Sequence, residues 1–166
     1  TYFPTVDGPA HLYNANIISE LLKNGNGFLS SFYSFNTFIP PNLTGHFILV
    51  GLLSVFPGYI AEKIILLIFL FGLPLGLRHI FKSLENKNLI ILYFIFPFTY
   101  SFLFYYGSFN FNLAIVLLLF GLSYSIRFRN KSQLKSFFVN LFFCTILSFT
   151  HIFVFAIFLL FLFYYV

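Results

Sequence analysis

The stretch YIAEKIILLIFLFGLPLGLRHIFKSL, residues 59–84, decides the fold class of this chain. It is long enough to cross a bilayer as a helix, for which about 20 mostly apolar residues suffice. Its far end carries Arg78 and Lys82. Pro74, with a glycine two residues to either side, predicts a kink near that basic end. The stretch is therefore predicted to be a membrane-spanning helix.

Further apolar stretches follow this first one. One of them is interrupted by Pro97, and the last is a run of 33 residues, 134–166, with Thr150 and His151 in its middle. That run fits one long tilted helix, but two helices that meet at a break near His151 fit it better. The predicted spans are thus residues 59–82, 89–106, 109–126, 134–149 and 151–166, all approximate.

Residues 1–58 differ from the rest of the chain. They are polar to mixed, with the turn-rich sequences NGNG at 24–27 and PPN at 40–42. TGHFILVGLLSVF, residues 44–56, is apolar but too short to span, so we expect it to lie in the membrane interface. The sequence predicts an all-α fold: a polytopic transmembrane helix bundle, 59–166, with an extracytoplasmic loop, 1–58, that contains two interfacial helices.

Composition agrees with a membrane protein. Of the 166 residues, 60% are hydrophobic and 8% are charged, whereas a soluble domain has about 25% charged residues. Seven of the nine Lys and Arg fall in two short runs, Arg78–Lys87 and Arg127–Lys135. Basic runs between apolar spans are typical of cytoplasmic loops, so the net charge of +5 does not predict a nucleic-acid partner. With no Met and no signal peptide, we read the chain as a fragment of a larger membrane protein.

The two basic runs also predict the orientation. Two spans separate them, so they lie on the same side, which should be cytoplasmic. The turns near Glu62, near residues 105–112 and near His151 then face outward. If 44–56 does not cross the membrane, residues 1–43 are outside as well; if it does cross, they are inside. The length of 44–56 favours the outside.

The segment DGPAHLYNA, residues 7–15, is the most polar motif on that outer face. Asp-Gly-Pro suits the start of a helix, with Asp7 as its N-cap. An apolar stripe is expected along Ala10, Tyr13, Ile17 and Leu21, with His11, Asn14 and Glu20 towards the other side. Capping is a sufficient explanation of Asp7, and a carboxylate fixed at a helix start is also well oriented for chemistry.

Few ionisable residues exist in this chain, and several gather on the predicted outer face. His11 is close enough to Asp7 to share a pocket with it, and His46 and His151 are also expected near the outer boundary. Ionisable groups in membrane proteins often mark function, although a lone histidine there is more often a hydrogen-bonded tip. No two histidines have the i, i+4 spacing of a helical metal site, so no metal site is predicted. Asn110 and Asn112, in GSFNFNLA, either cap a helix or join the site.

This layout resembles the GT-C superfamily of polytopic membrane glycosyltransferases. In that superfamily a first span leads into an outer loop with a catalytic Asp, and two outer helices and a bundle of spans follow. Here Asp7 takes the place of the catalytic acid, the helix from Pro9 looks like the first outer helix, and 44–56 looks like the second. DGPAHLYNA is also similar to segments of uncharacterised bacterial membrane proteins, which implies a bacterial cytoplasmic membrane.

The resemblance implies transfer of a sugar from a polyprenyl-phosphate donor to a glycan, lipid or protein acceptor at the outer face, with Asp7 as the base. One carboxylate opposite the leaving group gives inversion. His11, Asn14, His46, Asn110, Asn112 and His151 are the expected substrate-binding residues. Several GT-C families have a second acid where this chain has Asn110 and Asn112, so we expect no divalent metal and no other cofactor.

A second class of function remains open: a non-catalytic membrane module of a polysaccharide export or transport system. Such a module would have polar residues midway through its spans, lining a path. The predicted spans hold only weakly polar residues there, such as Ser101, Asn140 and Ser148, which favours the transferase.

Overall fold

The computed structural model describes residues 5–23, 27–36, 41–85, 90–129 and 132–165, and all regular secondary structure in these ranges is helical. The predicted all-α class is therefore confirmed for this part of the chain. In order, the elements are α1 (Gly8–Lys23), the short 3-10 helix η1 (Phe28–Ser31), α2 (Thr44–Leu53), α3 (Gly58–Ser83), the 3-10 helix η2 (Ile90–Ile95), α4 (Phe96–Thr99), α5 (Phe102–Tyr106), α6 (Phe109–Phe128), α7 (Gln133–Thr150) and α8 (Ile152–Tyr165).

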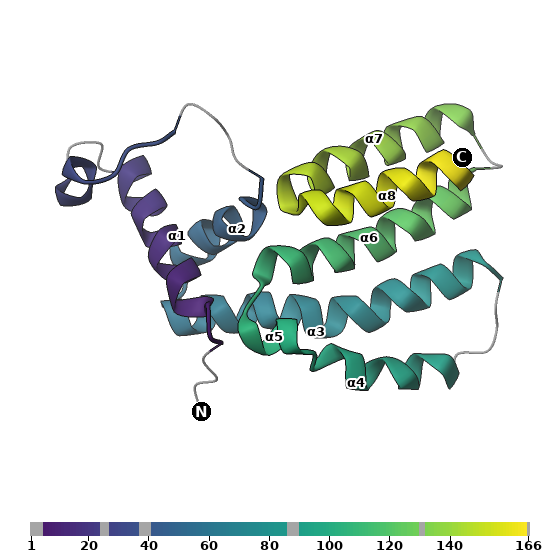
Figure 1. Cartoon of the computed structure of the whole chain (residues 1–166), viewed down its shortest axis with the longest axis horizontal. Coiled ribbons are helices and arrows are strands. Elements are labelled where there is room, and N and C mark those ends of the chain that lie inside the picture. Colours follow the sequence, from purple (N-terminus) through teal and green to yellow (C-terminus); the bar gives the residue numbers. More distant parts are fainter. Residues whose placement is uncertain (1–4, 24–26, 37–40, 86–89, 130–131, 166) are drawn as a thin grey trace.

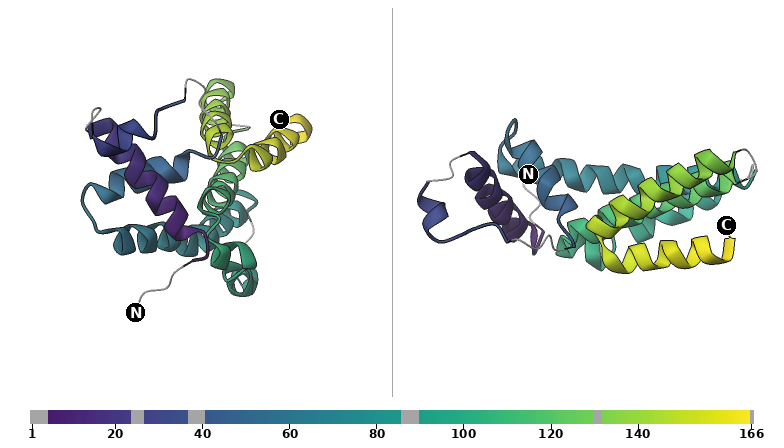
Figure 2. Two further views of the ribbon diagram at one scale, coloured as in Figure 1. Left: turned by 60° about the vertical axis from the view of Figure 1, so that its left-hand side comes forward. Right: turned by 90° about the horizontal axis from the view of Figure 1, so that it is seen from above.

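The long helices lie side by side and form one elongated group. Helices α3 and α6 run in the same direction, α7 runs back, and α8 returns again (Figure 1). Helices α1 and α2 cover the end of this group where α3 and α6 begin (Figures 1 and 2). The ends of α3 and α6 that carry the basic residues Lys82 and Arg127 lie together at the opposite end.

Within the described ranges, three helices are long and apolar enough to cross a membrane, namely α3, α6 and α7. This property suggests membrane association. Helix α2 has 10 residues, which at 1.5 Å per residue is about half of the ~30 Å hydrocarbon core. The predicted break in the last apolar run is present, because His151 is extended (φ −162°, ψ 113°) and separates α7 from α8.

The segment that follows α3 is not the single helix predicted over 89–106. Its described part divides into η2, α4 and α5. Pro97 lies in the first turn of α4, and the helical geometry is interrupted at Tyr100 and Ser101 before α5 begins. The segment nevertheless returns the chain from the basic end to the end covered by α1 and α2 (Figure 1).

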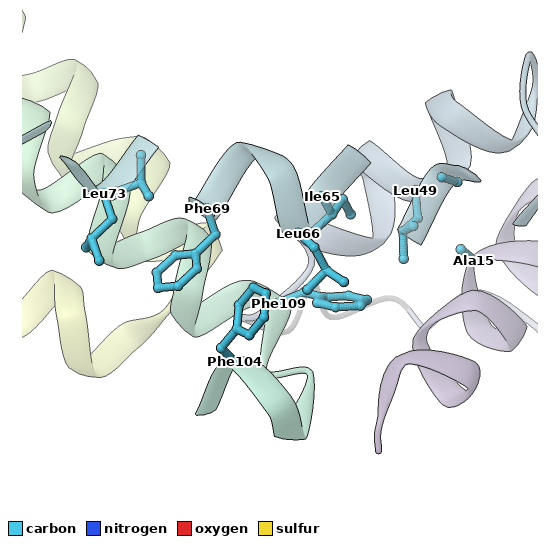
Figure 3. Close-up of a cluster of buried hydrophobic side chains, with 10 residues drawn as sticks. Ala15, Leu49, Ile65, Leu66, Phe69, Leu73, Phe104 and Phe109 are labelled. Atoms are coloured by element: carbon cyan, nitrogen blue, oxygen red, sulfur yellow. The ribbon is translucent and has the colours of Figure 1, made fainter. Parts of the chain in front are cut away.

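Two apolar cores hold the helices together. The first joins α3 to α6, α2, α1 and α5 through residues such as Leu49, Ile65, Phe69, Phe104 and Phe109 (Figure 3). The second joins α6, α7 and α8 and is made of Ala114, Leu118, Phe143, Leu147, Val154 and Phe158. Both cores include α6, which is therefore the central helix of the fold.

Small residues allow α3 and α6 to approach closely. A Cβ placed on Gly72 would lie 2.7 Å from Val116 Cγ1, and one on Gly76 would lie 2.8 Å from Leu119 Cβ. Glycines four residues apart on one helix face are a recurrent contact surface between membrane helices. The glycines around Pro74 therefore serve packing against α6, and α3 continues through that proline.

Candidate functional site

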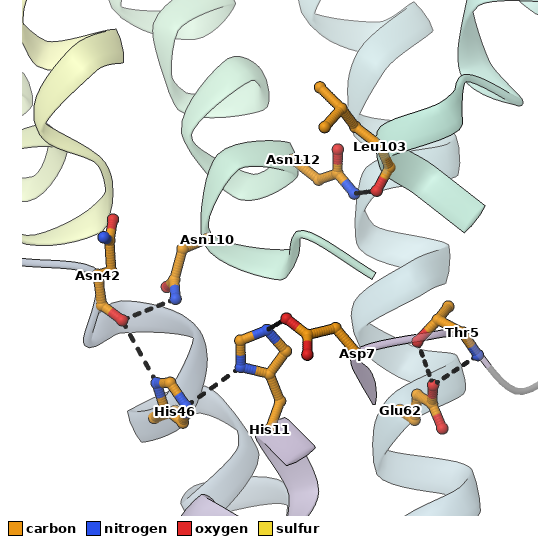
Figure 4. Close-up of polar contacts among 9 residues, drawn as sticks. All are labelled: Thr5, Asp7, His11, Asn42, His46, Glu62, Leu103, Asn110 and Asn112. Carbon is orange, nitrogen blue, oxygen red and sulfur yellow. Dashed lines mark hydrogen bonds and ion pairs between the residues drawn. The ribbon is translucent and has the colours of Figure 1, made fainter. Parts of the chain in front are cut away.

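A chain of polar contacts links Asp7 to the start of α6. Asp7 Oδ2 lies 3.6 Å from His11 Nε2. The other ring nitrogen of His11, Nδ1, is 3.2 Å from His46 Nε2 on α2. His46 Nδ1 is in turn 3.3 Å from the carbonyl oxygen of Asn42 (Figure 4). The structure thus brings together three of the residues that the sequence singled out.

Asn110 completes this chain of contacts. Its side-chain amide donates to the Asn42 carbonyl at 2.7 Å (Figure 4). Its Oδ1 accepts from the backbone N–H of Gly45, also at 2.7 Å. Asn42 has φ 69°, a left-handed conformation that Asn adopts more readily than most residues. We refer to Asp7, His11, His46, Asn42 and Asn110 as the polar array.

The position of Asp7 is fixed by its backbone. Its N–H donates to the carbonyl of Tyr106 at 2.8 Å, and the preceding N–H, of Val6, donates to Tyr105 at 3.2 Å. The segment with these two carbonyls turns sharply at Gly107. The φ of Gly107 is 87°, a left-handed conformation that glycine adopts at little cost. The carbonyl of Asp7 accepts from the N–H of His11 at 3.1 Å, so Asp7 immediately precedes α1.

The inward face of α1 differs from the apolar stripe predicted for it. Ala10 and Tyr13 are exposed, whereas Gly8 and Ala15 are buried, and only Ile17 of the predicted stripe is buried. His11 lies on this inward side, with its ring 5.0 Å from that of Phe109. The prediction was wrong because the inward face carries small residues and a histidine, which a search for an apolar stripe does not detect. Gly8 lies against Thr5 and Glu62, and Ala15 joins the first apolar core.

Glu62, like Asn42, is a residue near the site that the sequence analysis did not select. Its side chain is 1% exposed, and its Oε1 accepts hydrogen bonds from Thr5, at 3.3 Å from the backbone N–H and at 2.8 Å from the hydroxyl (Figure 4). These contacts anchor the segment before Asp7 to α3. The sequence signal that could have identified Glu62 is its position as an acidic residue within an apolar helix. Burying such a residue in a membrane helix costs free energy, so it has a defined partner.

Asn112 and His151 lie outside the polar array. Asn112 is buried, and its amide is 3.4 Å from the Leu103 carbonyl, which ties α6 to α5. His151 packs edge-on against Phe111, and its Nδ1 is buried without a hydrogen-bond partner among the described residues. The adjacent Thr150 at the end of α7 contacts the start of α2, because its hydroxyl donates to that of Thr44 at 2.9 Å.

A pocket of about 610 Å³ adjoins the polar array. His46 and Thr44 of α2 and Asn14 of α1 contribute polar groups to it. Its walls are otherwise mainly apolar and aromatic, with Tyr33, Phe35, Phe47 and Phe149 among the lining residues. Asn14, which the sequence placed in the site, is therefore a pocket residue and not a member of the array.

The environment of His11 favours its neutral form. Burial lowers its pKa, and the neighbouring His46 lowers it further, while Asp7 and Glu62 act in the opposite direction. Asp7 itself has a side chain that is 45% exposed, so that a ligand can reach its carboxylate. A carboxylate beside a neutral imidazole can accept protons and bind hydroxyl groups.

Asp7, His11 and His46 also have the chemistry of metal ligands. Within the described ranges, however, no three or more His, Cys, Asp or Glu side chains gather in an arrangement that could hold a metal ion.

Comparisons with known proteins give no family for this chain: it matches no family model, no curated protein and no solved structure.

Proposed function

We propose that this chain is part of a polytopic integral membrane glycosyltransferase of the GT-C kind. It would take a sugar from a polyprenyl-phosphate donor and transfer it to an acceptor on the extracytoplasmic side, in a bacterial cytoplasmic membrane. The observation that carries the proposal is the accessible carboxylate of Asp7, held between His11 and the segment at Tyr106. His11 contacts His46, which lines a pocket of about 610 Å³.

The membrane part of the proposal is supported by the surface of the long helices. Large apolar side chains on α3, α7 and α8 are exposed, including Phe71, Phe137, Leu160 and Phe163. A soluble protein rarely exposes apolar surface on this scale, and lipid is its natural cover. The basic residues at the end opposite the polar array favour that end as the cytoplasmic one.

The proposed chemistry needs one base and one stabilised leaving group. Asp7 accepts the proton of the attacking hydroxyl, whose oxygen then bonds the anomeric carbon of the donor sugar from the side opposite the phosphate. The bond between that carbon and the phosphate oxygen breaks, and the lipid phosphate leaves with the electron pair. Because a phosphate is already a good leaving group, no paired acid is required.

The remaining candidates have distinct roles in this proposal. His11 lies where the acceptor binds, and His46 contacts His11. Asn14 lines the adjoining pocket. Asn110 joins α2 to α6 through two hydrogen bonds and is a positioning residue. Asn112 contacts Leu103 and is given a structural role.

An export or transport module has less support. Polar side chains inside the long helices pair with one another: Ser125 donates to Asn140 at 2.6 Å, and Ser83 and Ser123 share a hydrogen bond of 2.8 Å. Groups that bind each other between helices are typical of helix packing, and a transport path would need them free to face a substrate.

The test is the Asp7→Asn variant of the full-length protein, expressed in cells whose own copy of the gene is deleted. The matched control is Glu20→Gln, which changes an acid near the far end of α1, the helix that Asp7 precedes. We expect Asp7→Asn to abolish the change in envelope glycans that the wild type restores, measured by mass spectrometry, and Glu20→Gln to restore it. Both purified variants should keep a thermal midpoint near that of the wild type. Restoration by a correctly folded Asp7→Asn protein would refute the proposal.

A further inference from the structure

The direction of the hydrogen bonds in the polar array fixes which nitrogen of each histidine carries hydrogen. A carbonyl oxygen only accepts, so His46 Nδ1 must donate to Asn42. In neutral His46 the other nitrogen, Nε2, is then an acceptor, and His11 Nδ1 is the donor to it. It follows that Nε2 of neutral His11 carries a lone pair.

That lone pair faces the carboxylate of Asp7. His11 Nε2 and Asp7 Oδ2 are 3.6 Å apart, and both are acceptors when His11 is neutral and Asp7 is ionised. Two acceptors cannot satisfy each other, so their geometry is complementary to a ligand that brings two hydrogens. The segment before α1, α1 itself and α2 thus build a two-acceptor site.

We propose that Asp7 and His11 together bind two neighbouring hydroxyls of one acceptor molecule, so that the acceptor is a carbohydrate with a vicinal diol. The oxygens of a gauche vicinal diol lie somewhat closer together than these two acceptors. Each hydroxyl therefore reaches one acceptor at an ordinary hydrogen-bond length of about 2.7–3.0 Å. This inference rests on the transfer proposed above and names the class of its acceptor.

The two hydroxyls have different fates. The hydroxyl on Asp7 gives its proton to the carboxylate, and its oxygen attacks the donor sugar, so that one O–H bond and one carbon–phosphate-oxygen bond break while a glycosidic bond forms. The neighbouring hydroxyl donates to His11 Nε2 and stays intact. His46 touches neither hydroxyl; it is a positioning residue that keeps His11 in the required tautomer.

The adjoining pocket suits the remainder of a carbohydrate. A sugar ring has apolar C–H faces and a polar rim, and the pocket that His46 lines combines aromatic rings, such as Tyr33 and Phe149, with the amide of Asn14 and the hydroxyl of Thr44. A Ser or Thr side chain of a protein acceptor offers one hydroxyl and would leave the second acceptor unfilled, which weakens binding.

The site is sensitive to acid. The charged and titratable groups that face His11 are Asp7 before α1, His46 on α2 and Glu62 on α3, and α6 presents the Phe109 ring. Once His11 is protonated, Nε2 becomes a donor and pairs with Asp7 Oδ2. The Nε2 acceptor is then lost, and the facing lone pair of the carboxylate is occupied. Because burial lowers the pKa of His11, the two-acceptor form persists through the neutral range.

The first experiment measures the state of His11 directly. The full-length protein, labelled with nitrogen-15 histidine, is studied by NMR in lipid nanodiscs at pH 7.5, and His11 is assigned from the signal lost in His11→Gln. We expect an unprotonated Nε2 and a protonated Nδ1. Two protonated nitrogens, the opposite tautomer, or a signal that moves when EDTA removes a metal ion would each overturn the inference.

The second experiment uses cis-cyclohexane-1,2-diol as the probe and cyclohexanol, with one hydroxyl, as its matched control. The diol should shift the His11 Nε2 signal with an affinity higher than that of cyclohexanol by roughly threefold to tenfold, the contribution of one hydrogen bond. His46→Gln, which retains an acceptor for His11, should keep this preference, and a folded His46→Leu should lose it. Equal binding of the two probes would overturn the inference, whereas loss of transfer in Asp7→Asn tests only the proposed function.

Discussion

The backbone amide of Gly45 donates a 2.7 Å hydrogen bond to Oδ1 of Asn110, and this contact fastens the first turn of α2 to the first turn of α6. Both residues are buried. The same Asn110 side chain donates to the carbonyl oxygen of Asn42, and this oxygen also accepts the hydrogen bond from His46 Nδ1. Asn110 thus sets the position of α2. Because α2 carries His46, Asn110 also positions His46 Nε2, the hydrogen-bond acceptor for His11.

Replacement of Gly45 should test this contact. A Cβ at that position would lie 2.8 Å from Asn110 Oδ1, so Gly45→Ala must displace the side chain that its own N–H binds. We expect a loss of about 1–3 kcal/mol, as for other overpacked sites, measured by thermal unfolding in detergent. Gly51→Ala is the control on the same helix, because nothing lies within 4 Å of its Cβ. It should be neutral or stabilising by up to about 1 kcal/mol, since alanine favours helix. Equal effects of the two changes would contradict the role given to Gly45.

The close approach of α3 and α6 predicts a specific rescue. A Cβ on Gly72 would lie 2.7 Å from Cγ1 of Val116 and 3.0 Å from its Cγ2, so Gly72→Ala should destabilise by about 1–3 kcal/mol. Val116→Ala removes both methyl groups. The double variant should therefore be more stable than the sum of the single effects predicts, and the four proteins form a double-mutant cycle. If the changes in unfolding free energy were additive, Gly72 and Val116 would not be in contact.

The stability of the protein should fall in mild acid because of His11. Burial lowers its pKa in the folded protein below the ordinary value of 6.5, so the unfolded chain binds a proton first as the pH drops. The free energy of unfolding is then fully retained above about pH 6.5, decreases below it, and levels off once the pH is below the folded pKa. His11→Gln should flatten part of this slope in thermal unfolding measured from pH 7.5 to 5. An unchanged slope would show that His11 is not buried in its neutral form.

The sidedness of the outer segment can be measured with an impermeant thiol reagent. Ser31 is exposed at the end of η1, and Gln133 is exposed at the basic end of α7. In a Cys144→Ser background, Ser31→Cys should react in intact cells, and Gln133→Cys should react only after the cells are opened. The reverse pattern would put the polar array in the cytoplasm and exclude the proposed transfer.

The helices themselves could be predicted because their signals are local. Apolar length, basic ends and the polar interruption at His151 place α3, α6, α7 and α8 close to their observed bounds. The division of residues 90–106 was missed, although Pro97 is visible in the sequence, because the break at Tyr100 and Ser101 lies after the proline, between the end of α4 and the start of α5.

The site was harder to predict, because its contacts join residues far apart in the chain. Asp7 and His11 are neighbours on one turn and could be paired from their spacing alone. Their relation to His46 depends on how α1 packs against α2, and the predicted apolar stripe put His11 on the wrong side of α1. Glu62 was overlooked because it looked like a marker of the membrane interface, whereas its partner Thr5 is 57 residues away.

The hydrogen bond between Thr44 and Thr150 spans 106 residues of sequence, and this has a consequence for biosynthesis. The segment that carries Asp7, His11 and His46 leaves the ribosome before α6 and α7, yet the contacts that hold α2 in place come from α6 and from the end of α7. Native contacts of such long range form late. The polar array can therefore be assembled only after most of the chain has been synthesised, so a product truncated before α6 would lack an ordered site.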